Sequence, residues 1–283
     1  MMSIKYANIM FNFAPKSLLI LLILVYTSLV FATDEAKEQR WAAQVSDSLL
    51  TGDVAWLPRK SGKFLAIYTE NQASKTKGAV ILLHGIGAHP DWPEVIHPLR
   101  TTLPEFGWST LSIQMPVLTN DKRAHDYMPL MDEVAERIDA AIKFLQQKKI
   151  YNVVIMAHSL GTVMSAHYLA NTPDAKLRAY VGISMIGSDQ PKESKNASPP
   201  WNIKALETIK IPVLDIYGSE DNASVINSAK KRKNSAAKNN NTRYRQVVIK
   251  GADHFYHGYE TALLKRIRSW LSRYAAGSEI NLN

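Results

Sequence analysis

The most informative segment of the chain is Val153-Val154-Ile155-Met156-Ala157-His158-Ser159-Leu160-Gly161. It begins as an apolar, β-branched run typical of a buried strand, and a helical pattern over 160–170 follows it. A serine alcohol is a weak nucleophile at neutral pH, and a sharp strand-to-helix turn exposes it beside a base. Gly161 supplies one small neighbour, while Ala157 stands where the usual G-x-S-x-G pattern has glycine. The stretch predicts Ser159 as a nucleophile; the alternative is an ordinary turn with a surface serine.

Outward from this stretch, short β-rich runs alternate with longer helical patterns. We expect strands at 64–68, 79–83, 109–113, 153–156, 179–184, 213–217 and 244–249, and helices at 33–50, 127–147, 160–170, from about 222, and up to about 274. Strands separated by helices imply right-handed crossovers and a mostly parallel sheet covered by helices on both faces. The expected fold class is therefore α/β. In such sheets the chemistry collects at the carboxyl ends of the strands.

A second strand run, Val80 to Leu83, opens into the glycine-containing loop His84-Gly85-Ile86-Gly87. Acyl transfer places negative charge on the substrate oxygen, and two backbone N–H groups usually stabilise that charge. We expect one from Leu160, directly after the nucleophile, and the other from Ile86 or Gly87. His84 ends the strand, which favours an orienting hydrogen-bond role in the loop over a role as catalytic base.

The third run, Pro212 to Tyr217, ends in the acidic turn Gly218-Ser219-Glu220-Asp221. A carboxylate at this place can accept the Nδ1–H of an imidazole and fix its tautomer. Asp221 is the best placed residue for this role, and Asp215 and Glu220 are the second choices. An alternative for Asp221 is a structural role at the turn or at the start of the next helix.

The fourth run, Val247 to Ile249, is followed by Lys250-Gly251-Ala252-Asp253-His254. An imidazole has an unperturbed pKa near neutrality, so His254 is suited to carry the proton from Ser159 to the leaving group. His257 competes for this role, but it lies three residues later and is interpreted as a neighbour in the pocket.

These motifs, in the order Ser159, Asp221 and His254, resemble the α/β-hydrolase superfamily from about residue 64 to 274. The resemblance implies that superfamily's fold and catalytic triad, with His84-Gly85 at the oxyanion loop. More narrowly, the stretch His84-Gly85-Ile86-Gly87-Ala88-His89-Pro90-Asp91-Trp92-Pro93 looks like a loop found in small exported proteobacterial α/β-hydrolase-like proteins of unknown substrate.

The first 32 residues have the layout of a secretory signal peptide. Lys5 and Lys16 are their only charges, an apolar run from Leu18 to Ala32 follows, and small residues stand three and one places before Thr33. A helix over that run would be about 22 Å long, shorter than the roughly 30 Å hydrocarbon core of a membrane. We therefore expect cleavage near Ala32 and a periplasmic protein. The alternative is an uncleaved anchor in the inner membrane.

The surplus of positive charge is concentrated late in the chain. The net charge of +9 falls to +7 without Lys5 and Lys16, and basic residues crowd one stretch: Lys230, Lys231, Arg232, Lys233, Lys238, Arg243 and Arg245. Charge-rich helices on the outside of α/β domains are usually solvated, and no nucleic-acid motif accompanies this one, so no nucleic-acid partner is expected. A weak contact with an anionic membrane surface stays open.

The expected organisation is one domain over 33–283, without cofactor or metal. The eight histidines show no ligand spacing, cysteine is absent, and neither a P-loop nor a strand-anchored G-x-G-x-x-G is present. Residues 185–209 are polar and contain proline, and they lie where this fold commonly inserts a lid. Residues 115–126 offer apolar side chains near the strand ends. Both segments are expected to shape the pocket and to favour an uncharged or partly apolar acyl group.

Together these features predict a serine hydrolase that cleaves a carboxylic ester or related acyl bond of a small molecule through an acyl-enzyme intermediate. An acyltransferase, thioesterase or amidase would use the same triad. A different class of function is a hydrolase-like binding protein whose serine is idle, because fold does not fix function.

Overall fold

The computed structural model describes residues 33–173, 176–187 and 201–277. Every described residue belongs to one compact unit, Thr33–Asn283. The predicted signal peptide lies outside the described residues. Within the described part of the chain, no helix combines the length and the apolar character needed to cross a membrane.

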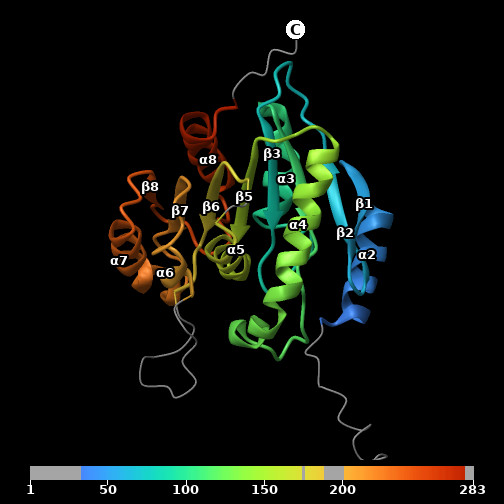
Figure 1. Cartoon of the computed structure of the whole chain (residues 1–283), viewed down its shortest axis with the longest axis horizontal. Coiled ribbons are helices and arrows are strands. Elements are labelled where there is room, and N and C mark those ends of the chain that lie inside the picture. Colours follow the sequence, from blue (N-terminus) through green and yellow to red (C-terminus); the bar gives the residue numbers. More distant parts are fainter. Residues whose placement is uncertain (1–32, 174–175, 188–200, 278–283) are drawn as a thin grey trace, which may run out of the picture. The chain divides into compact units, whose positions relative to one another are not determined.

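The described chain forms an eight-stranded sheet in the order β1-β2-β4-β3-β5-β6-β7-β8 (Figure 1). β1 pairs with β2, and β2 with β4, in antiparallel fashion, and all other neighbours are parallel. The mostly parallel sheet predicted from the sequence is therefore confirmed. The strands are β1 (Asp53–Arg59), β2 (Gly62–Thr69), β3 (Gly78–Leu83), β4 (Trp108–Ile113), β5 (Val153–His158), β6 (Ala179–Ile183), β7 (Val213–Gly218) and β8 (Tyr244–Ile249).

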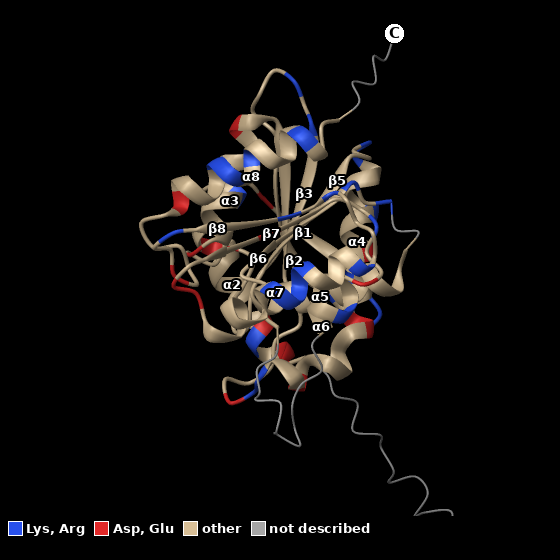
Figure 2. Ribbon diagram, turned by 90° about the vertical axis from the view of Figure 1, so that its left-hand side faces the viewer, with Lys and Arg blue, Asp and Glu red and all other residues tan. Residues whose placement is uncertain are grey.

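Helices cover both faces of the sheet. Figure 2 shows α3 and α8 on one side and α4 and α5 on the other. The α-helices are α2 (Glu35–Ser48), α3 (Ile96–Thr102), α4 (Met131–Gln147), α5 (Leu160–Asn171), α6 (Trp201–Ala205), α7 (Ala223–Lys238) and α8 (Glu260–Tyr274), and the 3₁₀ helices are η1 (Leu103–Phe106) and η2 (Ala124–Leu130).

The alternation of side chains along the central strands creates two cores. In β3, every second side chain, at positions 79, 81 and 83, packs into the core under α4 and α5. The side chains between them, Val80 and Leu82, pack into the core under α3 and α8. Every residue of β3 is buried. Strands buried on both faces read as continuous apolar runs, which explains why these strands were predictable.

Some short elements were not predicted from the sequence, and one helix differs from its prediction. The elements not predicted include the edge strand β1, the short helices α3 and α6, and the 3₁₀ helix η1. The helix expected at 127–147 begins as an α-helix only at Met131, because the 3₁₀ helix η2 contains Pro129 just before it. A proline inside an α-helix removes a hydrogen bond and clashes with the preceding turn.

The two segments expected to shape the pocket differ in what the structure describes. In the predicted lid at 185–209, residues 188–200 lie outside the described residues. Near its end, the buried Asn202 of α6 donates from Nδ2 to Thr162 Oγ1 and to the Ile186 carbonyl, at 2.9 and 2.8 Å. The expectation for 115–126 was wrong for its apolar part, because Met115 and Val117 are buried.

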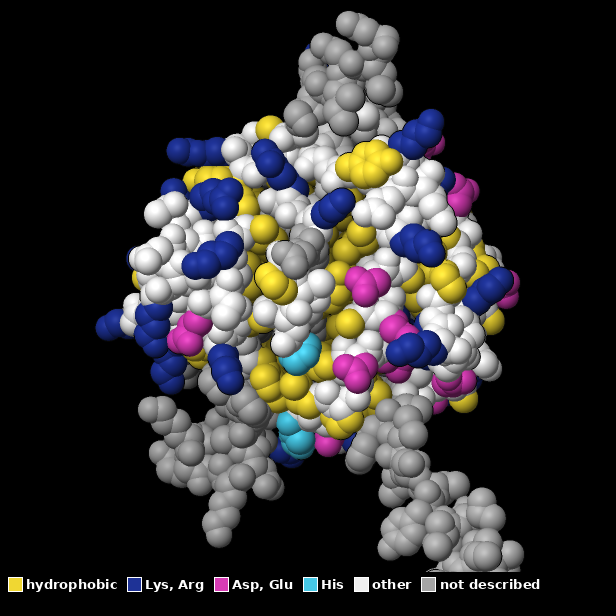
Figure 3. All heavy atoms as spheres, in the orientation of Figure 1, with side chains coloured by type: hydrophobic (Ala, Val, Ile, Leu, Met, Phe, Trp, Pro, Cys, Tyr) yellow, Lys and Arg dark blue, Asp and Glu magenta, His cyan; other side chains and the backbone are white. Residues whose placement is uncertain are grey.

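The positive charge is distributed over the molecule. On the face seen in Figure 3, Lys and Arg side chains are scattered over most of the surface. In the basic stretch of α7, Lys230, Lys231 and Lys233 are exposed as expected for a solvated helix face, but Arg232 is fully buried. The basic stretch of α7 therefore contains both exposed lysines and one buried cation, Arg232.

Candidate active site

Ser159 occupies a sharp turn between β5 and α5. Its backbone has φ 53° and ψ −120°, a conformation rare for residues with a side chain. The Ser159 N–H donates to the Ile183 carbonyl of the neighbouring strand at 3.0 Å, and the Ser159 carbonyl accepts from the Thr162 N–H at 2.9 Å. These bonds hold the strained turn in place. The sequence therefore builds the serine into a fixed position at the carboxyl end of β5.

The small residues around the turn are explained by close packing. A Cβ at Gly161 would lie 2.6 Å from the His84 carbonyl oxygen and 2.7 Å from that of Leu83. Only glycine lets the first turn of α5 approach the end of β3 this closely. Ala157, at the position where the pattern usually has glycine, lies in the core, so its methyl group is accommodated.

The structure brings Ser159, His254 and Asp221 together from the ends of three strands. His254 Nε2 lies 3.0 Å from Ser159 Oγ, and His254 Nδ1 lies 2.6 Å from Asp221 Oδ1. If Nδ1–H donates to the carboxylate, Nε2 is left as the acceptor for the serine hydroxyl. All three residues are buried, which limits their contact with water.

The Asp221 carboxylate is held by more than the histidine. Ser184 Oγ donates to Asp221 Oδ2 at 2.5 Å, and the Asn222 N–H donates to Oδ1 at 2.7 Å. Burial alone would raise the pKa of the Asp221 carboxyl, but the hydrogen bonds from His254 and Ser184 outweigh it and place the pKa below its ordinary value. Asp221 is thus an anion at neutral pH, available to stabilise a protonated His254.

The competing residues have other partners. Asp215 is fully buried and forms an ion pair with Arg232 at 2.7 Å. Glu220 is exposed, and His257 is exposed and pairs with Asp253 at 2.7 Å. Of the three acids considered from the sequence, Asp221 is therefore the one that contacts His254.

Two further histidines, His84 and His158, form hydrogen bonds with the backbone of the loops that carry the site. His84 Nδ1–H donates to the Gly85 carbonyl at 2.9 Å, while Nε2 accepts from the Met115 N–H at 2.9 Å. His158 Nε2–H donates to the backbone carbonyl of His254 at 3.0 Å. Burial lowers the pKa of His84 to about 3 and that of His158 to about 4, so both rings are neutral at neutral pH. The orienting role expected for His84 agrees with these contacts.

The loop after β3 passes directly beside the serine. A Cβ at Gly85 would lie 3.1 Å from Ser159 Cβ. Leu160 is the first residue of α5, so its N–H has no acceptor within the helix. Gly87 has φ +66°, a left-handed conformation that glycine adopts without strain. These features place the backbone expected to form an oxyanion hole on two elements that meet at Ser159.

Sequence reasoning missed two residues at the site, Ser184 and Tyr256. Both are fully buried non-glycine residues with positive φ, 55° and 61°. Their hydroxyl oxygens lie 3.3 Å apart, and the Tyr256 hydroxyl donates to the Ile216 carbonyl at 3.2 Å. The available signal was the position of Ser184, a polar residue directly after a buried strand at the sheet edge where Ser159 and Asp221 lie.

The described residues offer no evident metal centre. Among them, no group of three or more His, Cys, Asp or Glu side chains lies close enough together to hold a metal ion. The polar groups at the site form hydrogen bonds with one another, in an arrangement suited to moving a proton between Ser159 and His254.

The sequence matches the family described as "Protein of unknown function (DUF3530)" over residues 25–126 and 121–273. The chain belongs to the DUF3530 family. Among curated proteins, none matches the sequence of this DUF3530 member.

Solved structures show which fold this DUF3530 protein has. Est1E from Butyrivibrio proteoclasticus matches with a TM-score of 0.57 and 15% identity, covering 78% of this chain and 98% of its own. Dienelactone hydrolase from Anabaena variabilis matches with a TM-score of 0.59 and 20% identity, covering 80% and 98%. A monoglyceride lipase variant from Saccharomyces cerevisiae matches with a TM-score of 0.61 and 11% identity, covering 81% and 97%. The α/β-hydrolase fold predicted from the sequence is thereby confirmed.

Proposed function

We propose that this DUF3530 protein is a serine hydrolase that cleaves a carboxylic ester or related acyl bond through an acyl-enzyme intermediate. The observation that carries the proposal is the continuous hydrogen-bond chain from Ser159 Oγ through His254 to Asp221, with distances of 3.0 and 2.6 Å. A binding scaffold has no need of a base and an acid aligned in this way.

In the first half of the reaction, Ser159 Oγ attacks the acyl carbon while His254 Nε2 takes the hydroxyl proton. Asp221, kept anionic by Ser184 and the Asn222 amide, stabilises the imidazolium that forms. The negative charge on the substrate oxygen is met by the Leu160 N–H and by that of Ile86 or Gly87.

In the second half, the tetrahedral intermediate collapses and His254 gives its proton to the departing alcohol. This leaves the acyl group as an ester on Ser159. His254 then removes a proton from a water molecule, which attacks the acyl carbon and releases the carboxylic acid. Ser159 recovers its proton from His254, so the cycle closes without any other reactant.

The surroundings of the serine favour a substrate with an apolar part. Two large apolar side chains are exposed on the loops that carry the site: Ile86 at 44% and Phe255 at 39%. The Phe255 ring centroid lies 5.1 Å from that of His254. Structures with this fold include Est1E with ferulic acid bound and the yeast monoglyceride lipase with a substrate analogue. We propose an uncharged or partly apolar acyl group next to Ser159.

Labelling with a fluorophosphonate tests whether Ser159 is activated, because the reagent modifies only serines that are activated as nucleophiles. The wild-type protein should be labelled, and Ser159→Ala and His254→Ala should not. Ser61→Ala, which removes an exposed serine in the turn between β1 and β2, should be labelled like the wild type. An unlabelled wild-type protein that is fully folded would contradict the proposal and favour a binding protein.

The coupling between Ser159 and His254 tests the mechanism. In a working triad the two residues act as one unit, so each alanine variant should lower kcat on a p-nitrophenyl ester by several orders of magnitude, on the order of 10⁶ in comparable enzymes. The double variant should be scarcely worse than either single variant. Losses that multiply, or full activity in Ser159→Ala, would contradict the mechanism.

A further inference from the structure

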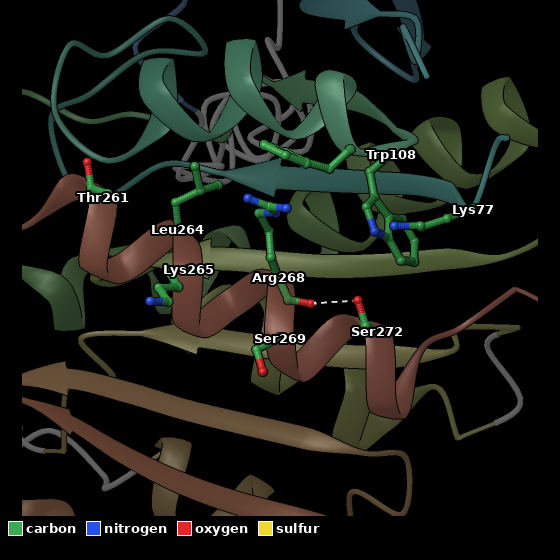
Figure 4. A pocket seen from close by; sticks show the side chains of 9 residues that line it. Lys77, Trp108, Thr261, Leu264, Lys265, Arg268, Ser269 and Ser272 are labelled. Atoms are coloured by element: carbon green, nitrogen blue, oxygen red, sulfur yellow. Dashed lines mark hydrogen bonds between the residues drawn. The ribbon is translucent and has the colours of Figure 1, made fainter. Parts of the chain in front are cut away.

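A second region of the molecule, formed between α8 and the start of β4, contains a cavity of about 420 Å³. Three cationic side chains line it: Lys77, Lys265 and Arg268. No Asp or Glu is present among its described lining residues. Figure 4 shows Thr261 at one end of this cavity and Trp108 with Lys77 at the other. We call it the cationic cavity.

The three cations have no counter-ion in the described part of the chain. The ion pairs formed by described residues do not include Lys77, Lys265 or Arg268. Like charges that share a cavity without a carboxylate produce a positive potential that attracts an anion. Hydroxyl groups at Ser269 and Ser272 lie on the same wall and can donate hydrogen bonds, although Ser272 Oγ now donates to the Arg268 carbonyl at 3.0 Å.

Arg268 is held in a position suited to binding. Its guanidinium lies over the face of the Phe106 ring, with Cζ 3.0 Å from the ring centroid. Stacking occupies the flat face of a guanidinium and leaves the N–H groups at its edge free to donate to an oxyanion. Phe106 therefore orients the cation without neutralising it.

The same cavity also has apolar walls. Phe106, Trp108 and Leu264 line it, so a ligand with only a charged group would leave these side chains without a partner. Leu264 and Thr261 also line a second cavity of about 190 Å³. Its other walls are mostly apolar and include Val95, Leu99 and Leu263, together with Glu260 and the active-site neighbour Phe255. Because two residues line both, the two cavities adjoin, with apolar surface continuing away from the cations.

We infer that the two cavities together bind an anionic amphiphile, with a phosphate or carboxylate head at Lys77, Lys265 and Arg268 and an alkyl chain running past Leu264. Each added CH₂ group that is buried should tighten binding by about fourfold, so the affinity should depend on chain length. This inference does not rest on the proposed hydrolase function, since neither Ser159 nor His254 lines either cavity, although Phe255 beside His254 borders the second one.

Binding is measured by calorimetry on the full chain, with dodecyl phosphate below its micelle concentration as the probe. Ethyl phosphate and dodecyltrimethylammonium are the comparison ligands. We expect dodecyl phosphate to bind at least about tenfold more tightly than either. Equal binding of dodecyltrimethylammonium would overturn the inference, because an apolar groove without an anion site would bind both amphiphiles.

A pair of matched variants separates the cavity from general electrostatic attraction. Replacing Lys77, Lys265 and Arg268 by glutamine should weaken dodecyl phosphate binding at least about tenfold. Replacing the exposed Lys230, Lys231 and Lys233 of α7 by glutamine removes the same charge elsewhere and should change the affinity less than about twofold. Equal losses in the two triple variants, or no loss in either, would overturn the inference.

Two single variants keep the test valid if the triple variant fails to fold. Lys265 is exposed, so Lys265→Glu should leave the fold intact while weakening the probe's binding. Thr261→Trp adds bulk where the cavities adjoin and should weaken dodecyl phosphate without affecting ethyl phosphate. Unchanged affinities for dodecyl phosphate in both variants would contradict the inference.

Vesicles distinguish the two sources of such a ligand. If the natural ligand is a membrane lipid, the protein should sediment with vesicles containing phosphatidylglycerol but not with pure phosphatidylcholine, and the cavity triple variant should lose this binding. If vesicle binding is the same in the wild type and the triple variant while dodecyl phosphate binding differs, the ligand is a free amphiphile. The N-terminal apolar segment is identical in all variants, so a difference in vesicle binding between the variants does not come from it.

Discussion

The contacts of Asp221 lead to a test of the acid at the level of a single residue. Asp221→Asn keeps the shape of the side chain but removes the charge that stabilises a protonated His254. We expect kcat on a p-nitrophenyl ester to fall by roughly 10⁴-fold, as in comparable triads, with the fold unchanged by circular dichroism. Glu220→Gln should have little effect, because that side chain, at the preceding position, is exposed. The reverse ranking would move the acid to Glu220.

Two buried histidines should make the stability depend on pH. The pKa of His84 is lowered to about 3 and that of His158 to about 4, whereas an unfolded chain titrates them near 6.5. Between these values the unfolded state binds more protons, so stability is fully present above about pH 6.5 and is lost as the pH falls toward 4. Two such groups give a slope of about 2.7 kcal/mol per pH unit in that window.

Urea unfolding between pH 4.5 and 6.5 measures this slope. His84→Gln should reduce it by about half, because one of the two groups is removed. His257→Gln is the control: the hydrogen bond that His257 donates to the Asp253 carboxylate raises the pKa of this exposed ring, so its removal should not reduce the slope. An unchanged slope in His84→Gln would show that this ring can be protonated in the folded protein.

Burial determined which helices and strands could be predicted from the sequence. β3 and β5 are buried on both faces and were predicted from continuous apolar runs, β7 was predicted although Asp215 interrupts its run, and β8 was predicted with its observed bounds. β1 was missed because it is an edge strand with exposed positions, and Pro58 lies within it. Proline is tolerated at an edge, where a missing N–H breaks no ladder, but it argues against a strand in a sequence.

The residues of the candidate site likewise fall into those predicted from the sequence and those missed. Ser159, Asp221 and His254, which the structure brings together, could be predicted because each follows an apolar run at a short distance and has the chemistry of a catalytic triad. Ser184 and Tyr256 were missed, because their roles depend on backbone conformations with positive φ and on contacts between distant strands. No local pattern reports those contacts. The supporting residues of the site therefore became evident only in three dimensions.

At the scale of the whole molecule, we propose that residues 1–32 direct export and are removed. The expected mature protein begins at or near Thr33 and is released with the periplasmic fraction, because the apolar run is shorter than a membrane span. N-terminal sequencing after cell fractionation measures this. A full-length product that stays with the inner membrane would contradict the proposal and favour an anchor.

The first described residue is already part of the folded domain. Thr33 is 6% exposed; its hydroxyl donates to the Val117 carbonyl at 2.9 Å and accepts from the Val117 N–H at 2.9 Å. The next residue, Asp34, donates its N–H to the same carbonyl at 2.7 Å.

Under the export proposal, the contacts of Thr33 and Asp34 with Val117 determine whether the leader is cut before or after this segment folds. A peptidase must hold the residues after the cut in its own cleft, and in the finished fold Thr33 and Asp34 are engaged with Val117. Removal of the leader must therefore precede the docking of this first segment. The new amino terminus would then close onto the domain as a late step of maturation, and a chain that folded too early would keep its leader.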